Sequence, residues 1–202
     1  MLPLDIESVK GFLDKEEGER LYQHALEAAL LGPVVEIGSY CGKSTVWLGA
    51  ACQQRDQLLY AIDHHRGSEE HQPGEEWHDA ALYDAELARM DSFPAFRKTL
   101  FRAGLEQTVV PVVASSAQAA RHWQAPVGMV FIDGGHSAQA ALTDYRCWAG
   151  HIAKGGLLAI HDVFPDPAEG GRPPFDIWQL AQVSGLFRPL PLFKTLGVLV
   201  RL

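Results

Sequence analysis

The sequence predicts an α/β fold, with a doubly wound, mostly parallel sheet of about seven strands, helices on both of its faces and an antiparallel strand at the C-terminus. The first observation behind this prediction is that short, wholly apolar runs alternate along the chain with stretches of helical periodicity. Strands that are apolar throughout are typical of parallel sheets that helices cover on both sides. The second observation is that two further apolar runs, PLPLF and TLGVLVRL, close the chain. We expect a single domain over residues 1–202.

The first half of the chain opens with an N-terminal helical segment, residues 1–31. Its helix covers residues 14–31, where Leu21 and Ala25 recur at helical spacing. Acidic residues fill the first turn, which the helix dipole favours, and Pro33 ends the helix. The elements that follow are, in order, a strand at 34–38, a helix at 44–52, a strand at 58–63 and a polar, turn-rich loop at 64–79.

The second half repeats this alternation of helices and strands. Its expected elements are helices around 80–90 and 95–103, strands at 109–116 and 127–133, a helix at 137–153, a strand at 157–162, and a closing pair of strands within 189–202. Pro111 has no N–H for a sheet ladder, so it indicates an edge position for its strand. Residues 163–178 contain four prolines and two glycines, which is typical of a loop.

The composition argues against several classes of protein. The chain has 202 residues and a formal net charge of −8, without the Lys/Arg stripe that duplex binding needs, so we expect no nucleic-acid partner. The three cysteines are widely spaced and form no CxxC pair, which disfavours a disulfide framework or a zinc site. The N-terminus is acidic where a signal peptide would be basic, and no run approaches the roughly 20 apolar residues of a membrane span. We therefore expect a cytoplasmic protein with no membrane partner.

Three of the expected parallel strands end in an acidic residue: Asp63, Asp133 and Asp162. Gly38 stands at the end of a fourth strand. Because ligands of such sheets bind beyond the carboxyl ends of the strands, these residues predict the position of the functional site. An unpaired carboxylate at the end of a buried strand is costly, and a function would explain that cost.

The glycine-rich turn EIGSYCGKST, residues 36–45, indicates which ligand the site binds. A phosphate-binding loop has four residues between its two glycines, whereas Gly38 and Gly42 have three between them. Glu36 would also bring negative charge close to a phosphate. S-adenosylmethionine (SAM) carries a sulfonium, an ammonium and no phosphate, so it suits this turn. Asp63, 21 residues after Gly42, has the position of an acid that takes both hydroxyls of a ribose.

Two longer stretches resemble a known family. VVEIGSYCGKST resembles the first motif of the catechol and caffeoyl-CoA O-methyltransferase type. VFIDGGHSAQAALTDYRCWAGHIAKGGLLAIHDVF resembles the small bacterial branch that includes the cephalosporin- and macrolide-tailoring O-methyltransferases. The resemblance covers roughly residues 10–165. It implies a class I SAM-dependent methyltransferase with a Rossmann-like sheet, which transfers a methyl group from SAM to an oxygen of a small-molecule acceptor.

The resemblance and the spacing of the motifs together predict the cofactor-binding residues. They are Glu36, Gly38, Ser39, Tyr40, Gly42, Asp63, His65, Ser115 and Asp133. Ser115 matches the position near the adenine in the relatives, and His65 matches the mouth of the site. We expect Lys43 to be a solvated lysine at the start of a helix. The four histidines of the loop at 64–79 have a spacing that matches no rigid metal-binding pair, so we expect most of them to be solvated.

The resemblance also implies catalytic residues and a divalent cation, magnesium or manganese. Carried over by position, His136 is the base, Asp133 is both a catalytic residue and a metal ligand, and Asp162 is a second ligand. His161 stands where many relatives have an acid, and an imidazole is a better ligand for a transition metal than for magnesium. Three alternatives stay open: a transition metal held with His161, a cation held by the two aspartates alone, or methyl transfer without a metal.

Other functions are weighed against methyl transfer. A catalytically inactive SAM-binding partner or scaffold would not need to keep acids and histidines at the strand ends. A nucleotide-binding protein that uses GKST would need the longer phosphate loop. A methyltransferase of DNA bases would carry an aromatic residue after the fourth strand, where IDGGH has none. Loops at this edge of the sheet carry specificity, so we expect residues 163–178 to form a mobile flap over the acceptor, and the sequence leaves a homo-oligomer open.

Overall fold

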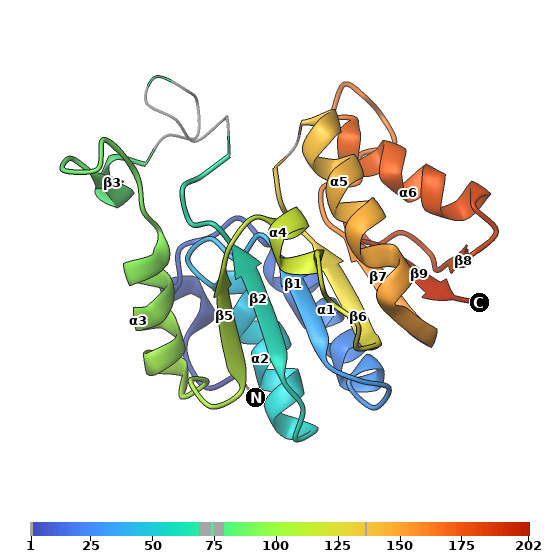
Figure 1. Cartoon of the computed structure of the whole chain (residues 1–202), viewed down its shortest axis with the longest axis horizontal. Coiled ribbons are helices and arrows are strands. Elements are labelled where there is room, and N and C mark those ends of the chain that lie inside the picture. The colour runs from blue at the N-terminus through green and yellow to red at the C-terminus, as the bar shows by residue number, and fades with distance from the viewer. Residues whose placement is uncertain (1, 69–73, 75–78, 136) are drawn as a thin grey trace.

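A mostly parallel sheet forms the centre of the fold. The computed structural model describes residues 2–68, 74, 79–135 and 137–202. Within these residues, seven strands lie side by side in the order β5–β2–β1–β6–β7–β9–β8 (Figure 1). The first five are parallel, and β9 runs antiparallel to both of its neighbours. This arrangement confirms the predicted α/β class and its C-terminal antiparallel strand.

The elements have the following bounds. The strands of the large sheet are β1 (Val34–Ile37), β2 (Leu59–Asp63), β5 (Val109–Val113), β6 (Val127–Ile132), β7 (Ile152–Ile160), β8 (Phe187–Pro189) and β9 (Gly197–Arg201). The helices are α1 (Lys15–Ala28), α2 (Lys43–Gln54), α3 (Phe93–Ala103), α4 (Ser116–Ala120), α5 (Ala138–Trp148) and α6 (Pro173–Val183). Shorter elements are the strands β3 (Tyr83–Asp84) and β4 (Arg89–Met90) and the 3-10 turns η1 (Ile6–Ser8), η3 (Ala80–Leu82) and η4 (Ala149–His151).

The apolar side chains of the sheet pack in two cores, one on each face. In β1, Val34 belongs to the core that includes residues of α1, α2 and α3, whereas Val35 belongs to the core that includes residues of α5 and α6. Phe131 and Val130 of β6 divide between the two cores in the same way. In Figure 1, α1 and α2 lie on the opposite side of the sheet from α5. Burial on both faces explains why these strands are apolar throughout.

The parallel pairing brings the carboxyl ends of the central strands to one edge of the sheet. The last residues of β1, β6 and β7 are paired with one another across these strands: Ile37, Ile132 and Ile160. The residues that follow them, Gly38, Asp133 and His161, are therefore neighbours. The N–H of Asp133 donates to the carbonyl of Ile37 at 2.8 Å, which extends the pairing past the end of the strand. This register places the acids of separate motifs in one site.

The edge position predicted from Pro111 is confirmed. Pro111 pairs with Ala61 of β2, and β5 is the outermost strand on that side of the sheet as described. The missing N–H of the proline therefore interrupts no ladder on the open side.

The expected helix around 80–90 is wrong. Ala80–Leu82 forms a 3-10 turn, and β3 and β4 then form an antiparallel ribbon. The carboxylate of Asp84 accepts hydrogen bonds from the N–H groups of Glu86 and Leu87, and such local bonds compete with a helix. Leu87 is also exposed, so a helix here would gain little from packing.

The segment 163–178 is more regular than expected. Pro173 and Pro174 begin α6, because a proline in the first turn gives up only an N–H that has no partner within the helix. Val163 is fully buried in the core, and residues 161–172 connect the end of β7 to the start of α6. Another difference is β7, which begins at Ile152, inside the stretch expected to be helical.

Within the described ranges, every helix is too short or too polar to cross a lipid bilayer.

Candidate active site

Glu36, in β1, is fully buried and organises the turn that follows the strand. Its carboxylate accepts hydrogen bonds from the hydroxyls of Ser39 at 2.9 Å, Ser44 at 2.6 Å and Thr45 at 2.6 Å. Burial raises the pKa of Glu36 to about 7, although these hydroxyls oppose the shift. Two cavities open at this edge of the sheet, and Glu36 is not among the described residues that line them. The side chain therefore faces the protein interior, and its expected contact with the cofactor stays a prediction.

Two glycines make the turn after β1. Gly38 has φ 87° and Gly42 has φ 95°, in the left-handed region that glycine adopts without strain. A Cβ on Gly38 would lie 2.1 Å from the carbonyl oxygen of Asp133. The turn therefore packs directly on the chain that leaves β6, and a larger residue than glycine does not fit at position 38.

Asp63, the last residue of β2, holds the same turn from the other side. Its Oδ2 accepts hydrogen bonds from the N–H groups of Ser39 at 2.9 Å and Tyr40 at 2.8 Å. Its Oδ1 accepts from the N–H of His65 at 2.7 Å. Oδ2 already accepts two bonds, but Oδ1 can accept a further one, so a ligand hydroxyl can still bind Asp63 beside the cavity that it lines.

Several loop residues at the carboxyl ends of the strands have a strained backbone conformation. Three non-glycine residues here have positive φ angles: Tyr40 at 47°, His65 at 59° and Asp162 at 57°. L-residues rarely adopt this conformation, and the surrounding structure must impose it. Such strain is concentrated at functional sites in many proteins.

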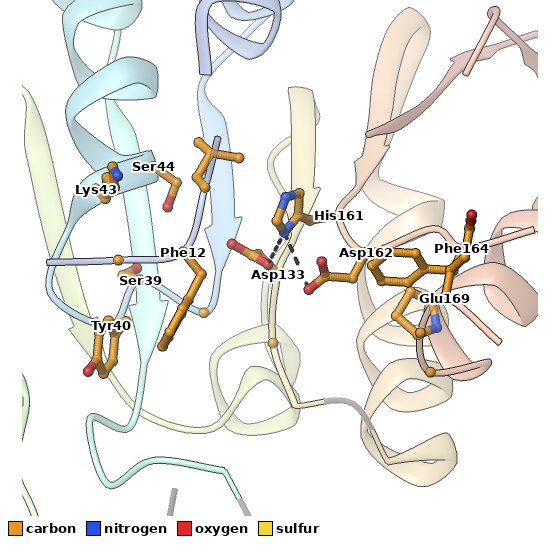
Figure 2. Close-up of a pocket in the computed structure, with 17 residues that line it drawn as sticks. Phe12, Ser39, Tyr40, Lys43, Ser44, Asp133, His161, Asp162, Phe164 and Glu169 are labelled. Carbon is orange, nitrogen blue, oxygen red and sulfur yellow. Dashed lines mark hydrogen bonds and ion pairs between the residues drawn. The ribbon is translucent and has the colours of Figure 1, made fainter. Parts of the chain in front are cut away.

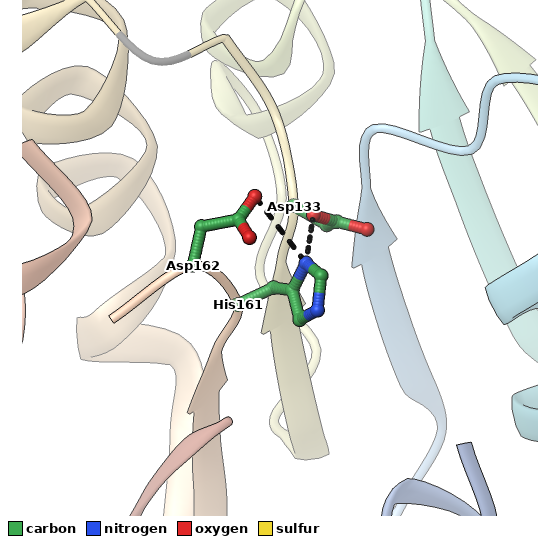
Figure 3. Close-up of side chains that lie close together, drawn as sticks. All are labelled: Asp133, His161 and Asp162. Atoms are coloured by element: carbon green, nitrogen blue, oxygen red, sulfur yellow. Dashed lines mark hydrogen bonds and ion pairs between the residues drawn. The ribbon is translucent and has the colours of Figure 1, made fainter. Parts of the chain in front are cut away.

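His161 follows β7 and lies among three carboxylates. Its Nδ1 is 3.0 Å from Oδ1 of Asp133 and 3.4 Å from Oδ2 of Asp162. Both aspartates point at the ring in Figure 3. Its Nε2 is 3.1 Å from Oε2 of Glu17. Burial alone would lower the pKa of His161, but the carboxylates of Asp133, Asp162 and Glu17 raise it well above its usual value.

Glu17, in α1, is a site residue that the sequence did not indicate. It is buried, and its Oε1 accepts hydrogen bonds from the N–H and the hydroxyl of Thr195. Burial pushes the pKa of Glu17 upward, but the hydrogen bonds from His161 and Thr195 outweigh that effect and leave the pKa below its usual value. In the sequence Glu17 is one of several acids in the first turn of a helix, and nothing there separates it from its exposed neighbours.

The three expected metal ligands, Asp133, His161 and Asp162, are brought together. One ligand atom from each lies within 4.8 Å of the other two. Two carboxylates and an imidazole nitrogen are a donor set that suits a divalent transition metal. Because Nε2 of His161 is bonded to Glu17, Nδ1 is the ring nitrogen that faces Asp133 and Asp162. A metal bound to Nδ1 would take the place of a proton on that atom. The residues therefore fit a divalent cation.

The first of two cavities opens where β1, β6 and β7 end, and we name it the β6–β7 cavity. It has a volume of about 580 Å³, and Asp133, His161 and Asp162 form part of its wall (Figure 2). Three aromatic residues also line it: Phe12, Tyr40 and Phe164. The rings of Phe12 and Tyr40 stack with their centroids 5.8 Å apart. A ligand in this cavity would meet both acidic groups and aromatic rings.

The second cavity lies beyond the ends of β2 and β5, and we name it the β2–β5 cavity. It has a volume of about 840 Å³ and is lined by Asp63 and Ser115, as well as by Asp144, which the sequence did not indicate. Burial raises the pKa of Asp144 to about 6. Ser115 also caps α4 by accepting from the N–H of Gln118. Gly38 lines both cavities, so the two meet at the turn after β1.

Lys43 differs from its expected role. Its side chain is only 12% exposed, and its Nζ lies 3.5 Å from Oε2 of Glu7. It lines the β6–β7 cavity together with Gly11, so the expectation of a solvated lysine is wrong. A Cβ on Gly11 would lie 2.6 Å from the Cβ of Lys43, which shows how closely the N-terminal segment covers this side chain.

His65 is also placed differently from the expectation. Its ring is buried against Phe93 and Phe96, and its Nδ1 lies 2.8 Å from the hydroxyl of Ser92. It is not among the described residues that line either cavity, and its expected contact with the cofactor stays a prediction. The expected base, His136, lies outside the described residues, as do His71 and His78 of the loop.

Comparison with protein families gives one match. Residues 35–163 match a family described as "Methyltransferase domain". The match begins in β1 and ends just after His161 and Asp162, so it contains the turn after β1 and all the strand ends described above.

Three solved structures illustrate the likeness of the fold. The O-methyltransferase NovP is 14% identical and has a TM-score of 0.68 over 92% of this chain and 79% of its own. The O-methyltransferase TomG from Streptomyces achromogenes, solved with SAM, is 16% identical, with a TM-score of 0.62 over 94% and 81%. An O-methyltransferase from Bacillus cereus, solved with SAH, is 14% identical, with a TM-score of 0.62 over 96% and 86%. At these identities the likeness concerns the fold.

Proposed function

Because the chain belongs to the family of methyltransferase domains, we propose that it transfers a methyl group from SAM to an oxygen of a small-molecule acceptor. Two of the similar structures support the choice of cofactor, since TomG was solved with SAM and the Bacillus cereus enzyme with SAH. The names of these proteins and of NovP support oxygen as the atom that is methylated.

The observation that carries the proposal is that two cavities of different character meet at Gly38. The β2–β5 cavity offers Asp63 for ribose hydroxyls and Ser115 near the end of β5, so it suits the adenosyl part of the cofactor. The β6–β7 cavity offers the carboxylates of Asp133 and Asp162, which complement positive charge, so it suits the methionine part and the acceptor. Because Gly38 borders both cavities, one cofactor molecule could occupy the two cavities together.

The residues of the β6–β7 cavity can align the reactants. Displacement at the methyl carbon requires the acceptor oxygen opposite the sulfur, and holding two reactants in this geometry lowers the barrier by itself. Phe12 and Phe164 provide apolar walls that orient a flat acceptor and exclude water. The acidic residues Asp133, Asp162 and Glu169 outnumber the basic residues Lys43 and His161 in this lining, which favours neutral or cationic acceptors over phosphorylated ones.

Asp133, His161 and Asp162 would hold a divalent cation, which when bound would favour ionisation of the acceptor hydroxyl. The base that takes the proton of the acceptor hydroxyl is a different residue from these three. His161 cannot take a proton from the acceptor while Glu17 and Asp133 occupy both of its ring nitrogens. His136 is therefore our proposed base, on the strength of its place in the IDGGH sequence.

The test of this function has two parts. We expect SAH to raise the melting temperature of the protein and ATP to leave it unchanged, which separates a methyltransferase from a nucleotide-binding protein. We then expect labelled methyl groups to pass from SAM to a hydroxylated aromatic acceptor. Binding of SAH without turnover of any acceptor in a panel would favour the inactive scaffold, and stabilisation by ATP alone would refute both.

A further inference from the structure

Glu17 of α1 forms a hydrogen bond to the imidazole of His161, at the ring nitrogen that does not face Asp133. Glu17 has 3% of its surface exposed, and its Oε2 lies 3.1 Å from Nε2 of His161. The distance and the burial make this a well-formed hydrogen bond between buried groups. The Nε2 atom of His161 is therefore occupied by its hydrogen bond to Glu17.

The carboxylate of Glu17 is itself fixed. Its Oε1 accepts from the N–H of Thr195 at 2.7 Å and from the Thr195 hydroxyl at 2.8 Å. Thr195 stands just before β9, so one carboxylate joins the first helix, the end of β7 and the approach to β9. With both oxygens bonded, Glu17 has little freedom to turn away from the ring.

The opposite edge of the ring faces the two aspartates. Nδ1 is 3.0 Å from Asp133 and 3.4 Å from Asp162, and these atoms lie on the wall of the β6–β7 cavity. A carboxylate that accepts from one ring nitrogen sets the tautomer, so that the other nitrogen offers its lone pair. Metal-ligating histidines in proteins almost always have such an outer partner.

We propose that Glu17 is a positioning residue that presents Nδ1 of His161, beside Asp133 and Asp162, to a divalent transition metal. This makes the site prefer Mn²⁺ or Co²⁺ over Mg²⁺, since magnesium demands oxygen ligands and an imidazole suits transition metals. The inference rests on the proposed function, because it concerns the same strand ends, but it is tested by metal binding rather than by turnover.

The experiment measures metal binding to the full chain with saturating SAH. Free Mn²⁺ is followed by its EPR signal, and Co²⁺ by its visible absorption, which reports the ligand field. We expect wild type to bind Mn²⁺ more tightly than Mg²⁺. Glu17→Gln should weaken Mn²⁺ binding by about 10- to 100-fold, because an amide cannot accept from both Thr195 and His161 without turning its NH₂ group toward one of them.

Two other variants keep the test decisive. Glu16→Gln changes a neighbouring glutamate that is exposed and pairs with Lys194, so it should bind Mn²⁺ like wild type. Thr195→Val leaves the Glu17 carboxylate in place but removes one of its anchors, so it should weaken Mn²⁺ binding in the same direction by less than Glu17→Gln. If Glu17→Gln does not fold, the Thr195→Val result decides.

Two results would overturn the inference. One is that wild type binds Mn²⁺ no better than His161→Ala, and the other is that Glu17→Gln and Thr195→Val both bind Mn²⁺ and give the Co²⁺ spectrum of wild type. Failure of SAH to bind wild type would instead count against the proposed function. Binding of SAH with no metal binding would count against this inference alone.

Discussion

Oε2 of Glu17 lies 3.1 Å from Nε2 of His161, although 144 residues separate the two along the chain. The contact joins the first helix to the end of β7, and with Asp133 on Nδ1 it occupies both nitrogens of the ring. A histidine held in this way cannot act as the base that receives the proton of the acceptor. Through this contact the N-terminal helix, which also packs in the core on one face of the sheet, becomes part of the candidate active site.

The first prediction concerns stability and pH at Glu36. Burial raises its pKa to about 7 in the folded protein, whereas the unfolded chain has the ordinary value of 4.5. The folded state therefore holds a proton that the unfolded chain releases above pH 4.5, so the free energy of unfolding falls as pH rises from 4.5 to about 7. The loss should total about 3 kcal/mol.

Glu36→Gln should lack this fall, because the hydroxyls of Ser39, Ser44 and Thr45 can rotate to pair with an amide. Urea unfolding of wild type and Glu36→Gln across this pH range measures the difference, and Glu106→Gln, an exposed glutamate, is the control. Parallel curves for wild type and Glu36→Gln would show that Glu36 does not titrate in this window.

The second prediction is that Gly38→Ala destabilises the protein and impairs cofactor binding. The new Cβ would lie 2.1 Å from the carbonyl oxygen of Asp133, at a φ of 87°. Overpacking and the left-handed backbone together should cost about 3 kcal/mol. Gly150→Ala, where a Cβ meets open space, should be close to neutral. Chemical denaturation and calorimetry with SAH measure both effects, and wild-type values for Gly38→Ala would contradict the described turn.

The sequence places the candidate site well where a motif or the end of a strand marks a residue. The spacing from Gly38 to Asp63 and the acids at the strand ends give the edge of the sheet and its central residues, because one rule of parallel sheets relates them. Prediction from the sequence does not reach contacts that depend on how distant parts of the chain pack together. His65 reads as part of a motif but packs against Phe93 and Phe96, and Glu17 reads as a helix-start acid but reaches His161.

The third prediction is that Asp63→Ala lowers the affinity for SAH by about 100-fold or more. The carboxylate orders the N–H groups of Ser39, Tyr40 and His65 and is available to ribose hydroxyls. Charge-assisted hydrogen bonds are worth about 1.5–3 kcal/mol each, so the loss of two accounts for this change. Asp63→Asn keeps one acceptor and should lie between the two. Calorimetric titration gives the affinities, and an unchanged value would remove Asp63 from the cofactor site.

The fourth prediction separates binding from stability at Phe12. Its side chain is 62% exposed but stacks on Tyr40 and lines the β6–β7 cavity. Phe12→Ala should leave the melting temperature nearly unchanged and weaken acceptor binding by roughly tenfold, the value of a lost aromatic contact. Phe101→Ala removes an even more exposed ring from α3, at 71%, and should change neither quantity. Equal acceptor KM values for the two variants would place the acceptor away from Phe12.

The last prediction concerns the base. A hydroxyl is a poor nucleophile at neutral pH, and a positioned base improves the rate by about 10²- to 10⁴-fold. Since His161 has both ring nitrogens occupied, His136 is the histidine of the IDGGH–HD pattern to which we assign the role. His136→Ala should lower kcat by that factor and leave SAH affinity unchanged. The base must be unprotonated to act, so wild-type activity should rise with pH over the range in which the base loses its proton. His136→Ala should lose this rise, whereas Glu16→Gln should keep it. A fully active His136→Ala with the wild-type pH profile would require a different base, and the aspartates of the β6–β7 cavity would be the next groups to test.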